Sequence, residues 1–535
     1  KLIQLLKLLD QDSYILVNNK IKKEEKKTTK IVGDRLYILQ DTNKIQEGRF
    51  GFLPKYLDTK NIISFLKKMN FDENIIKTIF EKNETIGGRA RQLKKDGFTF
   101  DIGPTWYWMP DVFERFFGDF DKHPSDYYSL DKLNPAYSVY FGKNDAITIE
   151  NSLEKICQTF EKEEPGSSKQ LMEFIGGAKS NYDIAIKDLV YNPGVSPLEL
   201  VTPKTVLKVN QFLSTIKRDV RKKFKNNRLA QILEFPVLFL GAKPSNTPSF
   251  YNFMNYADFG LGTYHPKKGM YQVILGMEAL AKDLGVNIKT NANVESILVK
   301  NGTAKGIVVN GKKENCNLVL SGADYHHTET LLEEKHRQYS ERYWDKKIFA
   351  PSSLLFYVGF DKKLKKVDHH TLFFDVDFDV HAEAIYDNPA WPEKPLFYAS
   401  FPSITDESCA PKDKEAGIFL IPLAPGLEDT PELREEYFEK IINRFEELTQ
   451  QDVKKNIIFK ESFCVNDFKK DYNSYKGNAY GMANTLLQTA FLRPKLKSKK
   501  VKNLYFTGQL TVPGPGVPPS LISGKLTAEL IQKVL

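Results

Sequence analysis

The stretch from Thr78 to Tyr107 constrains the fold of this chain more than any other. A short apolar run, Thr78 to Phe80, ends in Glu81, and Gly87-Gly88-Arg89 follows. A carboxylate at the carboxyl end of a strand in an open α/β sheet is well placed to accept hydrogen bonds from a ribose diol. Paired glycines let the backbone approach a phosphate, and Arg89 adds a fixed positive charge with several donors. The glycines alone are more typical of a plain turn, but the whole string predicts a nucleotide-binding edge.

A second signal lies between residues 501 and 535. Asn503 to Gly508 is typical of a strand that ends in glycine, and a turn rich in Gly and Pro follows from Thr511 to Ser520. Leu521 to Leu535 then has the pattern of a helix, with Ser520 as its expected N-cap. A strand, a rigid turn and a capped helix place free backbone N–H groups and a positive dipole end at one point. A plain strand-to-helix turn would not need two Gly-Pro alternations, so a cofactor-binding element is favoured.

The remaining pattern mixes helices and strands. The segments of interest are an expected helix at 271–284, strands at 287–290, 294–299, 306–309 and 318–320, helices over 151–235, strands at 354–360, 371–374 and 417–422, and a helix at 430–450. Residues 35–39 are expected to form a strand and residues 60–69 a helix. The apolar run at 233–241 fits either a tunnel mouth open to lipid or a buried core segment. This mixture predicts an α/β fold.

The residues from Thr78 onward resemble flavin-dependent amine oxidases and bacterial-type phytoene desaturases. The continuation Gly103-Pro104-Thr105-Trp106 to Phe113, together with Ala323 to Thr328, is most similar to the desaturases. The resemblance covers about residues 75 to 535. It implies an α/β protein with a Rossmann-like FAD-binding domain in discontinuous segments (61–150, 260–345 and 481–535). A substrate and membrane-facing α+β domain would comprise 151–259 and 346–480, and residues 1–60 form an atypical N-terminal segment.

The resemblance also implies a set of cofactor-binding residues. By its motifs the FAD-binding residues are expected to be Glu81, Gly87, Gly88, Arg89, Gly103, Pro104, Thr105, Val294, Gly508, Gly514, Gly516 and Val517. Among them, the backbone of the strand at Val294 would meet the adenine, and the turn at Gly514 and Gly516 would face the flavin ring. No constellation of His, Asp and Glu singles out a catalytic acid or base.

One part of the dinucleotide-binding pattern is missing. The glycines of a GxGxxG loop should lie about 20 residues before Glu81, yet that region reads KYLDTKNII and contains no glycine. The nearest candidates, Gly48 to Gly51, lie too far upstream. Because the chain begins at Lys1, a truncated, processed or frame-disrupted N-terminal segment is one expectation that stays open.

Composition excludes several classes of function. The net charge is +9, but lysines and acids are interleaved, so no nucleic-acid footprint is expected, whereas an anionic membrane surface would attract the chain. Four dispersed cysteines indicate a reduced compartment. No metal site is expected, and the pairs His326-His327 and His369-His370 are interpreted as turn or surface residues. No run of about 18 apolar residues and no signal peptide is seen, so a cytoplasmic, peripherally membrane-associated protein is expected.

The resemblance implies an FAD-dependent oxidoreductase that desaturates a carotenoid precursor such as phytoene and so extends its conjugated polyene. Its partners would be a long polyene hydrocarbon and a membrane surface. Two alternatives stay open. One is a carotenoid isomerase or oxygenase of the same flavoprotein type. The other is a non-catalytic, flavin-free relative, which the missing GxGxxG loop would explain.

Overall fold

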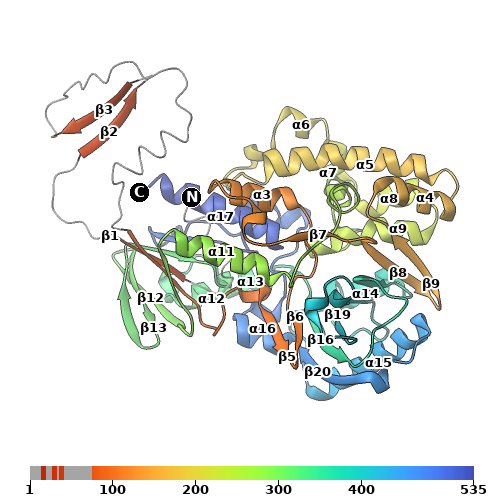
Figure 1. Ribbon diagram of the computed structural model, residues 1–535. Helices are drawn as coiled ribbons and strands as arrows, with labels where there is room; N and C mark the ends of the chain where they lie inside the picture. Colours follow the sequence, from red (N-terminus) through yellow and green to blue (C-terminus); the bar gives the residue numbers. More distant parts are fainter. Residues whose placement is uncertain (1–13, 20–26, 33–34, 41–74, 535) are drawn as a thin grey trace.

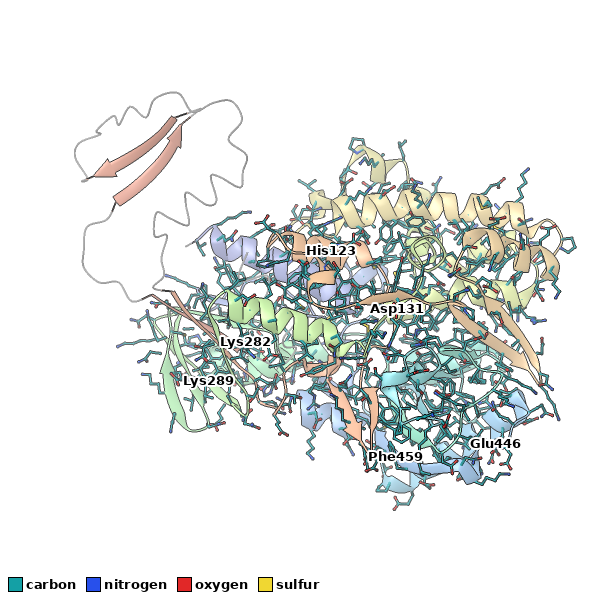
Figure 2. The ribbon with its side chains drawn as sticks, viewed as in Figure 1. His123, Asp131, Lys282, Lys289, Glu446 and Phe459 are labelled. Carbon is teal, nitrogen blue, oxygen red and sulfur yellow. The ribbon has the colours of Figure 1, made fainter. Side chains whose placement is uncertain are left out.

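The computed structural model describes residues 14–19, 27–32, 35–40 and 75–534. These residues form a five-stranded sheet, a seven-stranded sheet and a layer of helices (Figure 1). Lys289 lies in the five-stranded sheet and Phe459 lies in the seven-stranded sheet, and the two residues are well separated in the molecule (Figure 2). The predicted α/β class with an α+β part is confirmed.

The five-stranded sheet carries the segments expected to bind the cofactor. Its strand order is β11 (Val286–Lys289), β4 (Ile75–Phe80), β1 (Tyr14–Asn19), β15 (Leu318–Ser321) and β21 (Leu504–Phe506). β11 runs parallel to β4 and β21 runs parallel to β15, while β1 is antiparallel to both of its neighbours. The carboxyl ends of β4, β11, β15 and β21 therefore lie at one edge. β15 and β21 are fully buried, as expected for parallel strands covered on both faces, whereas burial alternates along the edge strand β11.

Strand β1 occupies the middle of this sheet in reverse. Tyr14 is opposite Phe80 and Asn19 is opposite Ile75. In a dinucleotide-binding fold the central strand runs parallel to its neighbours and leads into the glycine loop. No described strand leads into such a loop at this edge, which agrees with the missing sequence pattern. The glycines at 48–51 and the helix expected at 60–69 lie outside the described residues.

The helices beside this sheet include α3 (Pro110–Gly118), α11 (Tyr271–Asp283), α12 (Tyr325–Thr330) and α17 (Val517–Gln532). The hairpin of β5 (Gln92–Lys95) and β6 (Phe98–Asp101) fixes α11, because the two carboxylate oxygens of Asp101 accept the backbone N–H groups of Met270 (2.7 Å) and Tyr271 (3.2 Å). Such a carboxylate satisfies N–H groups that a helix cannot pair itself.

The start of α17 corrects one prediction. The helix begins at Val517 with Gly516 as its N-cap, not after Ser520. Pro518 and Pro519 are tolerated in its first turn because N–H groups there lack intrahelical partners. The backbone N–H of Ser520 donates to the Gly516 carbonyl oxygen at 3.0 Å, so this serine lies inside the helix.

The seven-stranded sheet separates two cores. Its order is β20 (Ile457–Phe463), β16 (Ser352–Phe360), β19 (Glu415–Leu423), β18 (Phe397–Ser400), β17 (His370–Phe373), β8 (Tyr137–Gly142) and β9 (Asp145–Ile149). Phe373 on one face packs against Phe445 of α15 (Pro431–Thr449), while Leu372 and Tyr398 on the other face belong to the main core. β8 and β9 thus join this sheet, although the expected boundary at residue 150 places them with the cofactor segments.

The helical layer crosses the top of Figure 1. It comprises α4 (Leu153–Glu163), α5 (Ser167–Ile184), α6 (Pro203–Val206), α7 (Val209–Leu213), α8 (Ile216–Lys223), α9 (Asn227–Glu234) and α10 (Phe253–Asn255). The apolar run at 233–241 forms the end of α9 and a 3₁₀ turn, with Phe235, Val237 and Leu240 buried in the main core. None of the helices described is both long enough and apolar enough to cross a membrane.

The remaining elements are small. They are a sheet of β12 (Val294–Lys300), β13 (Thr303–Val309) and β14 (Lys312–Asn315), the pair β7 (Leu130–Lys132) and β10 (Tyr264–Pro266), the pair β2 (Lys27–Val32) and β3 (Arg35–Gln40), and the helices α13 (Glu341–Asp345), α14 (Phe378–Tyr386) and α16 (Val465–Tyr472). The strand expected at 35–39 is therefore confirmed.

Candidate functional site

Glu81 lies at the carboxyl edge of the five-stranded sheet, directly after β4. It is fully buried, and its Oε1 accepts the backbone N–H of Asn83 at 2.6 Å. Its Oε2 has no hydrogen-bond partner among the described residues. The Glu81 carbonyl oxygen accepts the Ala292 N–H at 2.7 Å, so the Glu81 backbone lies beside the segment that leads into β12 at Val294. A buried carboxylate oxygen is rarely left unpaired, so this atom is suited to a hydroxyl donor from a ligand.

The GGR segment and Gly103 are in backbone contact. Gly87 has φ 107°, in the left-handed region that favours glycine, and it precedes the 3₁₀ turn Gly88–Ala90. A β-carbon on Gly103 would lie 1.7 Å from the carbonyl oxygen of Arg89. Only glycine therefore fits at position 103, and the two predicted cofactor segments are held together there.

Arg89 is buried and points toward the C-terminal segment. One Nη lies 3.5 Å from the Asn478 carbonyl oxygen, and the guanidinium lies 5.0 Å from the Tyr472 ring centre. With the Gln509 amide oriented to satisfy its neighbours, its side-chain oxygen accepts from both Arg89 Nη atoms at 3.1 and 3.2 Å. Arg89 thus links the GGR segment to the segment that contains Gly508.

The C-terminal turn is built from glycines and anchored by an arginine. Gly508 (φ 115°), Gly514 (φ 139°) and Gly516 (φ 110°) all adopt positive φ. Arg493 is buried and donates to the carbonyl oxygens of Met482, Gln488, Gln509 and Thr511 and to Asn484 Oδ1, at 2.6–3.1 Å. Burial lowers its pKa from 12.5 to about 10. Because its donors hold the backbone on both sides of residue 510, Arg493 fixes the approach to the turn.

Beyond Gly103 the chain enters a group of aromatic rings, here called the Trp106 cluster. The ring centres of its other members lie 4.0–5.8 Å from the ring centre of Trp106. These members are Trp108, Tyr137, Phe235, Phe239, His370 and Tyr398. Thr105, the residue before Trp106, hydrogen-bonds Tyr398 through its hydroxyl at 2.8 Å. A large apolar, aromatic surface therefore adjoins the predicted cofactor segments.

His369 and His370 correct another prediction. Both are buried, at 2% and 0% exposure, rather than turn or surface residues. His370 begins β17, and alternation along the strand directs its ring into the main core, where it stacks on Trp106 at 4.0 Å and 10°. The Nδ1 of His369 instead contacts the Thr405 hydroxyl at 2.6 Å.

Asp258 is a second buried ionisable group at the Trp106 cluster. Its Oδ2 accepts the Tyr137 hydroxyl at 2.7 Å, and its Oδ1 has no partner in the described part of the chain. Burial raises its pKa from 3.8 to about 8, and the Tyr137 hydrogen bond offsets this in part. At neutral pH the group is therefore mainly a carboxylic acid.

His265, Asp406 and Cys409 also lie together, with potential ligand atoms within 4.8 Å of one another. Both Asp406 oxygens already accept donors, however. Oδ2 accepts the Lys268 backbone N–H and contacts His265 Nε2, and Oδ1 accepts the Ser408 N–H and hydroxyl. The Asp406 carboxylate thus joins the loop at Lys268 to the loop at Ser408 by hydrogen bonds, and this structural role explains why the three residues lie together.

The structure thus brings Glu81 near Val294, and Gly87, Gly88 and Arg89 near Gly103. Pro104 and Thr105 lead from this contact to the Trp106 cluster, and Gly508, Gly514, Gly516 and Val517 lie along the C-terminal turn. Sequence reasoning missed Asp258, His370, Tyr398 and Arg493. Only the pair of adjacent histidines was a visible signal, since the burial of Tyr398 depends on strand pairing and that of Asp258 and Arg493 depends on packing between segments far apart in the sequence.

The sequence comparisons identify close relatives. The family described as "Flavin containing amine oxidoreductase" matches residues 76–532. A carotenoid 3,4-desaturase of Haloarcula japonica is 41% identical over 460 residues, covering 85% of this chain and 92% of that protein. A 4,4'-diapophytoene desaturase (4,4'-diaponeurosporene-forming) of Staphylococcus haemolyticus is 33% identical, covering 84% and 93%.

Solved structures share the fold. An oxidoreductase from Methanosarcina mazei matches with a TM-score of 0.53 at 15% identity, covering 84% of this chain and 94% of that chain. A variant of putrescine oxidase matches with a TM-score of 0.52 at 10% identity, covering 85% and 93%.

These findings confirm the predictions of an oxidoreductase acting on CH–CH groups, of FAD as cofactor and of carotenoid desaturation as the reaction class. They do not favour the isomerase, oxygenase or non-catalytic alternatives. The chain belongs to the flavin-containing amine oxidoreductase family and, within it, to the carotenoid desaturases.

Proposed function

We propose that this chain desaturates a long acyclic carotenoid precursor, of the phytoene or diapophytoene type, on a membrane surface. The observation that carries this proposal is the position of the Trp106 cluster directly after Gly103 and Thr105, the predicted cofactor segment. The named relatives act on carotenoids and diapophytoene. An apolar polyene would pack on aromatic rings beside the flavin.

The described residues fit the nucleotide half of FAD. The unpaired, buried Oε2 of Glu81 would accept a ribose hydroxyl, and the backbone near Val294 would contact the adenine. This geometry supports a ribose site at the carboxyl edge of the sheet.

The C-terminal turn fits the flavin ring. Gly514 and Gly516 keep side chains away from the turn, and the N-terminus of α17 offers the backbone N–H of Val517 and a positive dipole end, while Pro518 and Pro519 carry no N–H. Thr507 adds a buried hydroxyl with no hydrogen-bond partner in the described part of the chain. When bound, the flavin supplies a two-electron acceptor for hydride. The protein positions it through Arg493 and Gly103 and excludes water with the Trp106 cluster.

The ribose assignment is testable by affinity. Glu81→Ala removes one charge-assisted hydrogen bond, worth about 1.5–3 kcal/mol, and we expect the Kd for FAD to rise about 10–100-fold. Flavin fluorescence titration measures this directly. Glu84→Ala, three residues on at an exposed position, is the matched control. An unchanged Kd in Glu81→Ala would contradict the assignment.

We also propose the membrane-docking surface. The apolar patch is defined by exposed side chains on and around α6 and α7, namely Val195, Leu198, Val201, Val206, Leu207, Val209 and Leu213. These side chains are 51–85% exposed, and such concentrated exposure is unusual for a surface that faces only water. In helix α8, which follows, Lys217 pairs with Asp379 and Arg221 with Glu234, and Arg218, Lys222 and Lys223 add positive charge that would complement anionic lipid headgroups.

The patch is continuous with the main core. Phe212 of α7 stacks on Phe250 at 4.6 Å, and Phe250 contacts Phe253 at 6.1 Å. All three belong to, or pack against, the core that contains the Trp106 cluster. A hydrocarbon leaving the bilayer at the patch would thus meet apolar side chains on its way inward.

Vesicle flotation tests the docking surface. We expect the wild type to float with phosphatidylglycerol-containing vesicles, and the double variant Leu207→Asp/Leu213→Asp to bind at least about tenfold more weakly because two apolar contacts are lost. Val380→Asp on α14, also an exposed valine, is the control. Equal binding of the double variant and the control would refute this surface.

A further inference from the structure

The buried His370 side chain has one nitrogen engaged and one bare. Its Nδ1 lies 2.7 Å from the Tyr398 hydroxyl, and its Nε2 has no hydrogen-bond partner among the residues that the structure describes. The residue is fully buried and its ring stacks on Trp106. A buried imidazole nitrogen without a hydrogen-bond partner lowers the stability of the fold. Its presence on the aromatic side of β17 therefore points to a ligand.

The hydrogen bonds on the other side of the ring permit the tautomer that carries its proton on Nδ1. The Tyr398 hydroxyl has one proton to donate and lies 2.8 Å from the Thr105 hydroxyl as well as 2.7 Å from His370 Nδ1. If Tyr398 donates to Thr105, it accepts from Nδ1–H, and Nε2 then carries a lone pair. The Thr105–Tyr398 pair can therefore hold Nε2 as a hydrogen-bond acceptor on a ring that stacks against Trp106.

We propose that His370 Nε2 accepts the proton that leaves the substrate during desaturation, an inference that rests on the desaturase function proposed above. Oxidised FAD, when bound, would supply the two-electron acceptor for the hydride that one substrate carbon loses. The adjacent carbon loses a proton to Nε2, and the electron pair of that C–H bond forms the new C=C bond. The imidazole becomes an imidazolium, which must lose its proton before the next turnover.

A weakly basic imidazole is sufficient for this step. Burial, with a smaller contribution from His265, lowers the pKa of His370 well below 6.5, so the resting ring is neutral. The C–H group next to a carbon that has given up a hydride is strongly acidic, because the electron pair of this C–H bond can form a double bond to the electron-deficient carbon. The same low pKa makes the imidazolium release its proton readily after the step.

The other buried ionisable groups nearby are less suited. Asp258 has its pKa raised to about 8 and is already protonated at neutral pH. His369 contacts Thr405, and His265 contacts Asp406. His370 is the group that combines a bare nitrogen with direct stacking on Trp106.

The first test needs no flavin and no turnover. In ¹⁵N-histidine-labelled wild-type protein, we expect His370 to show a protonated Nδ1 and an unprotonated Nε2. We expect the Nε2 resonance to shift when phytoene in detergent micelles is added. His370→Asn identifies the signal among the eight histidines. A protonated Nε2, or an Nε2 resonance that phytoene leaves unmoved, would overturn the proposal.

The second test uses FAD-loaded enzyme in vesicles with phytoene. Asn keeps an amide near the Nδ1 position but has no base at Nε2, so we expect His370→Asn to bind FAD normally and to turn over about 10²–10⁴-fold more slowly. His369→Asn, equally buried and adjacent, should stay within a few-fold of the wild type. Tyr398→Phe keeps the aromatic ring of residue 398 but removes its hydroxyl. It should lower the turnover rate and increase the fraction of His370 that is protonated on Nε2.

The outcomes separate this inference from the proposed function. A wild type that binds FAD but never converts any acyclic carotene would refute the proposed function. A wild type that converts phytoene while His370→Asn converts it equally fast would refute only the role of His370. Equal losses in His370→Asn and His369→Asn would indicate a packing effect and would also overturn the proposal.

Discussion

Asp258 offers a quantitative test of the interior described above. The side chain is 3% exposed, its Oδ2 accepts the hydroxyl of Tyr137, a member of the Trp106 cluster, and its Oδ1 has no hydrogen-bond partner among the described residues. Asp258→Asn is nearly isosteric, and its carbonyl oxygen can still accept the Tyr137 hydroxyl. The substitution therefore removes the ionisation of this site while keeping its shape.

The magnitude follows from the pKa. In the folded chain Asp258 holds its proton up to about pH 8, whereas in the unfolded chain it releases it near 3.8. Between these values the unfolded chain binds fewer protons, so the free energy of unfolding falls as pH rises. One pKa unit is worth about 1.36 kcal/mol, which gives a loss of about 6 kcal/mol by pH 8. Below pH 4 both states are protonated and the loss vanishes.

Urea unfolding at pH 4.5, 6 and 8 is the assay. We expect Asp258→Asn to exceed the free energy of unfolding of the wild type by only about 1 kcal/mol near pH 4.5 and by several kcal/mol at pH 8. Asp131→Asn on β7 (Figure 2), where water solvates the exposed carboxylate in both states, is the control. A pH dependence equal in the wild type and Asp258→Asn would refute the reasoning.

Three further predictions concern stability and reactivity. Gly103→Ala places a β-carbon 1.7 Å from the Arg89 carbonyl oxygen and should lower the free energy of unfolding, measured by thermal unfolding, by at least about 3 kcal/mol. Gly176 in α5 has open space around it, so Gly176→Ala should raise the free energy of unfolding by about 0.5–1 kcal/mol. Arg493→Met leaves buried carbonyls unpaired and should cost about 3–5 kcal/mol; a loss below 1 kcal/mol would contradict its anchoring role. Burial raises the pKa of the Cys316 thiol to about 12, and all four cysteines are buried. A disulfide reagent should therefore label the cysteines only after unfolding. Fast labelling of the native protein would contradict this prediction.

Much of the local structure at the proposed cofactor edge could be predicted from the sequence. Glu81 follows an apolar strand, and the glycines at 508, 514 and 516 follow another, so each element carries its own signal. Contacts inside the chain then confirm that Gly103 meets the GGR segment. The start of α17 was misplaced because a Pro-rich stretch reads as a turn, although prolines are acceptable in a first helical turn.

The chemistry around Trp106 could not be predicted in the same way. His370 and Tyr398 lie on neighbouring strands of a sheet assembled from residues 137 to 463, and Asp258 comes from a helical segment. Whether a histidine faces water or an aromatic core depends on the register of this pairing, which a one-residue shift would reverse. The reversed direction of β1 is likewise a property of pairing and not of local pattern.

The most direct test of the account is the visible absorption spectrum of the purified protein with FAD, followed by anaerobic addition of phytoene in vesicles. We expect a bound-flavin spectrum. On addition of phytoene, the flavin absorption should decrease while polyene bands of longer wavelength appear. Protein that stays colourless at saturating FAD, or a bound flavin that never bleaches with any acyclic carotene, would contradict the assignment of this chain as a flavin-dependent carotenoid desaturase.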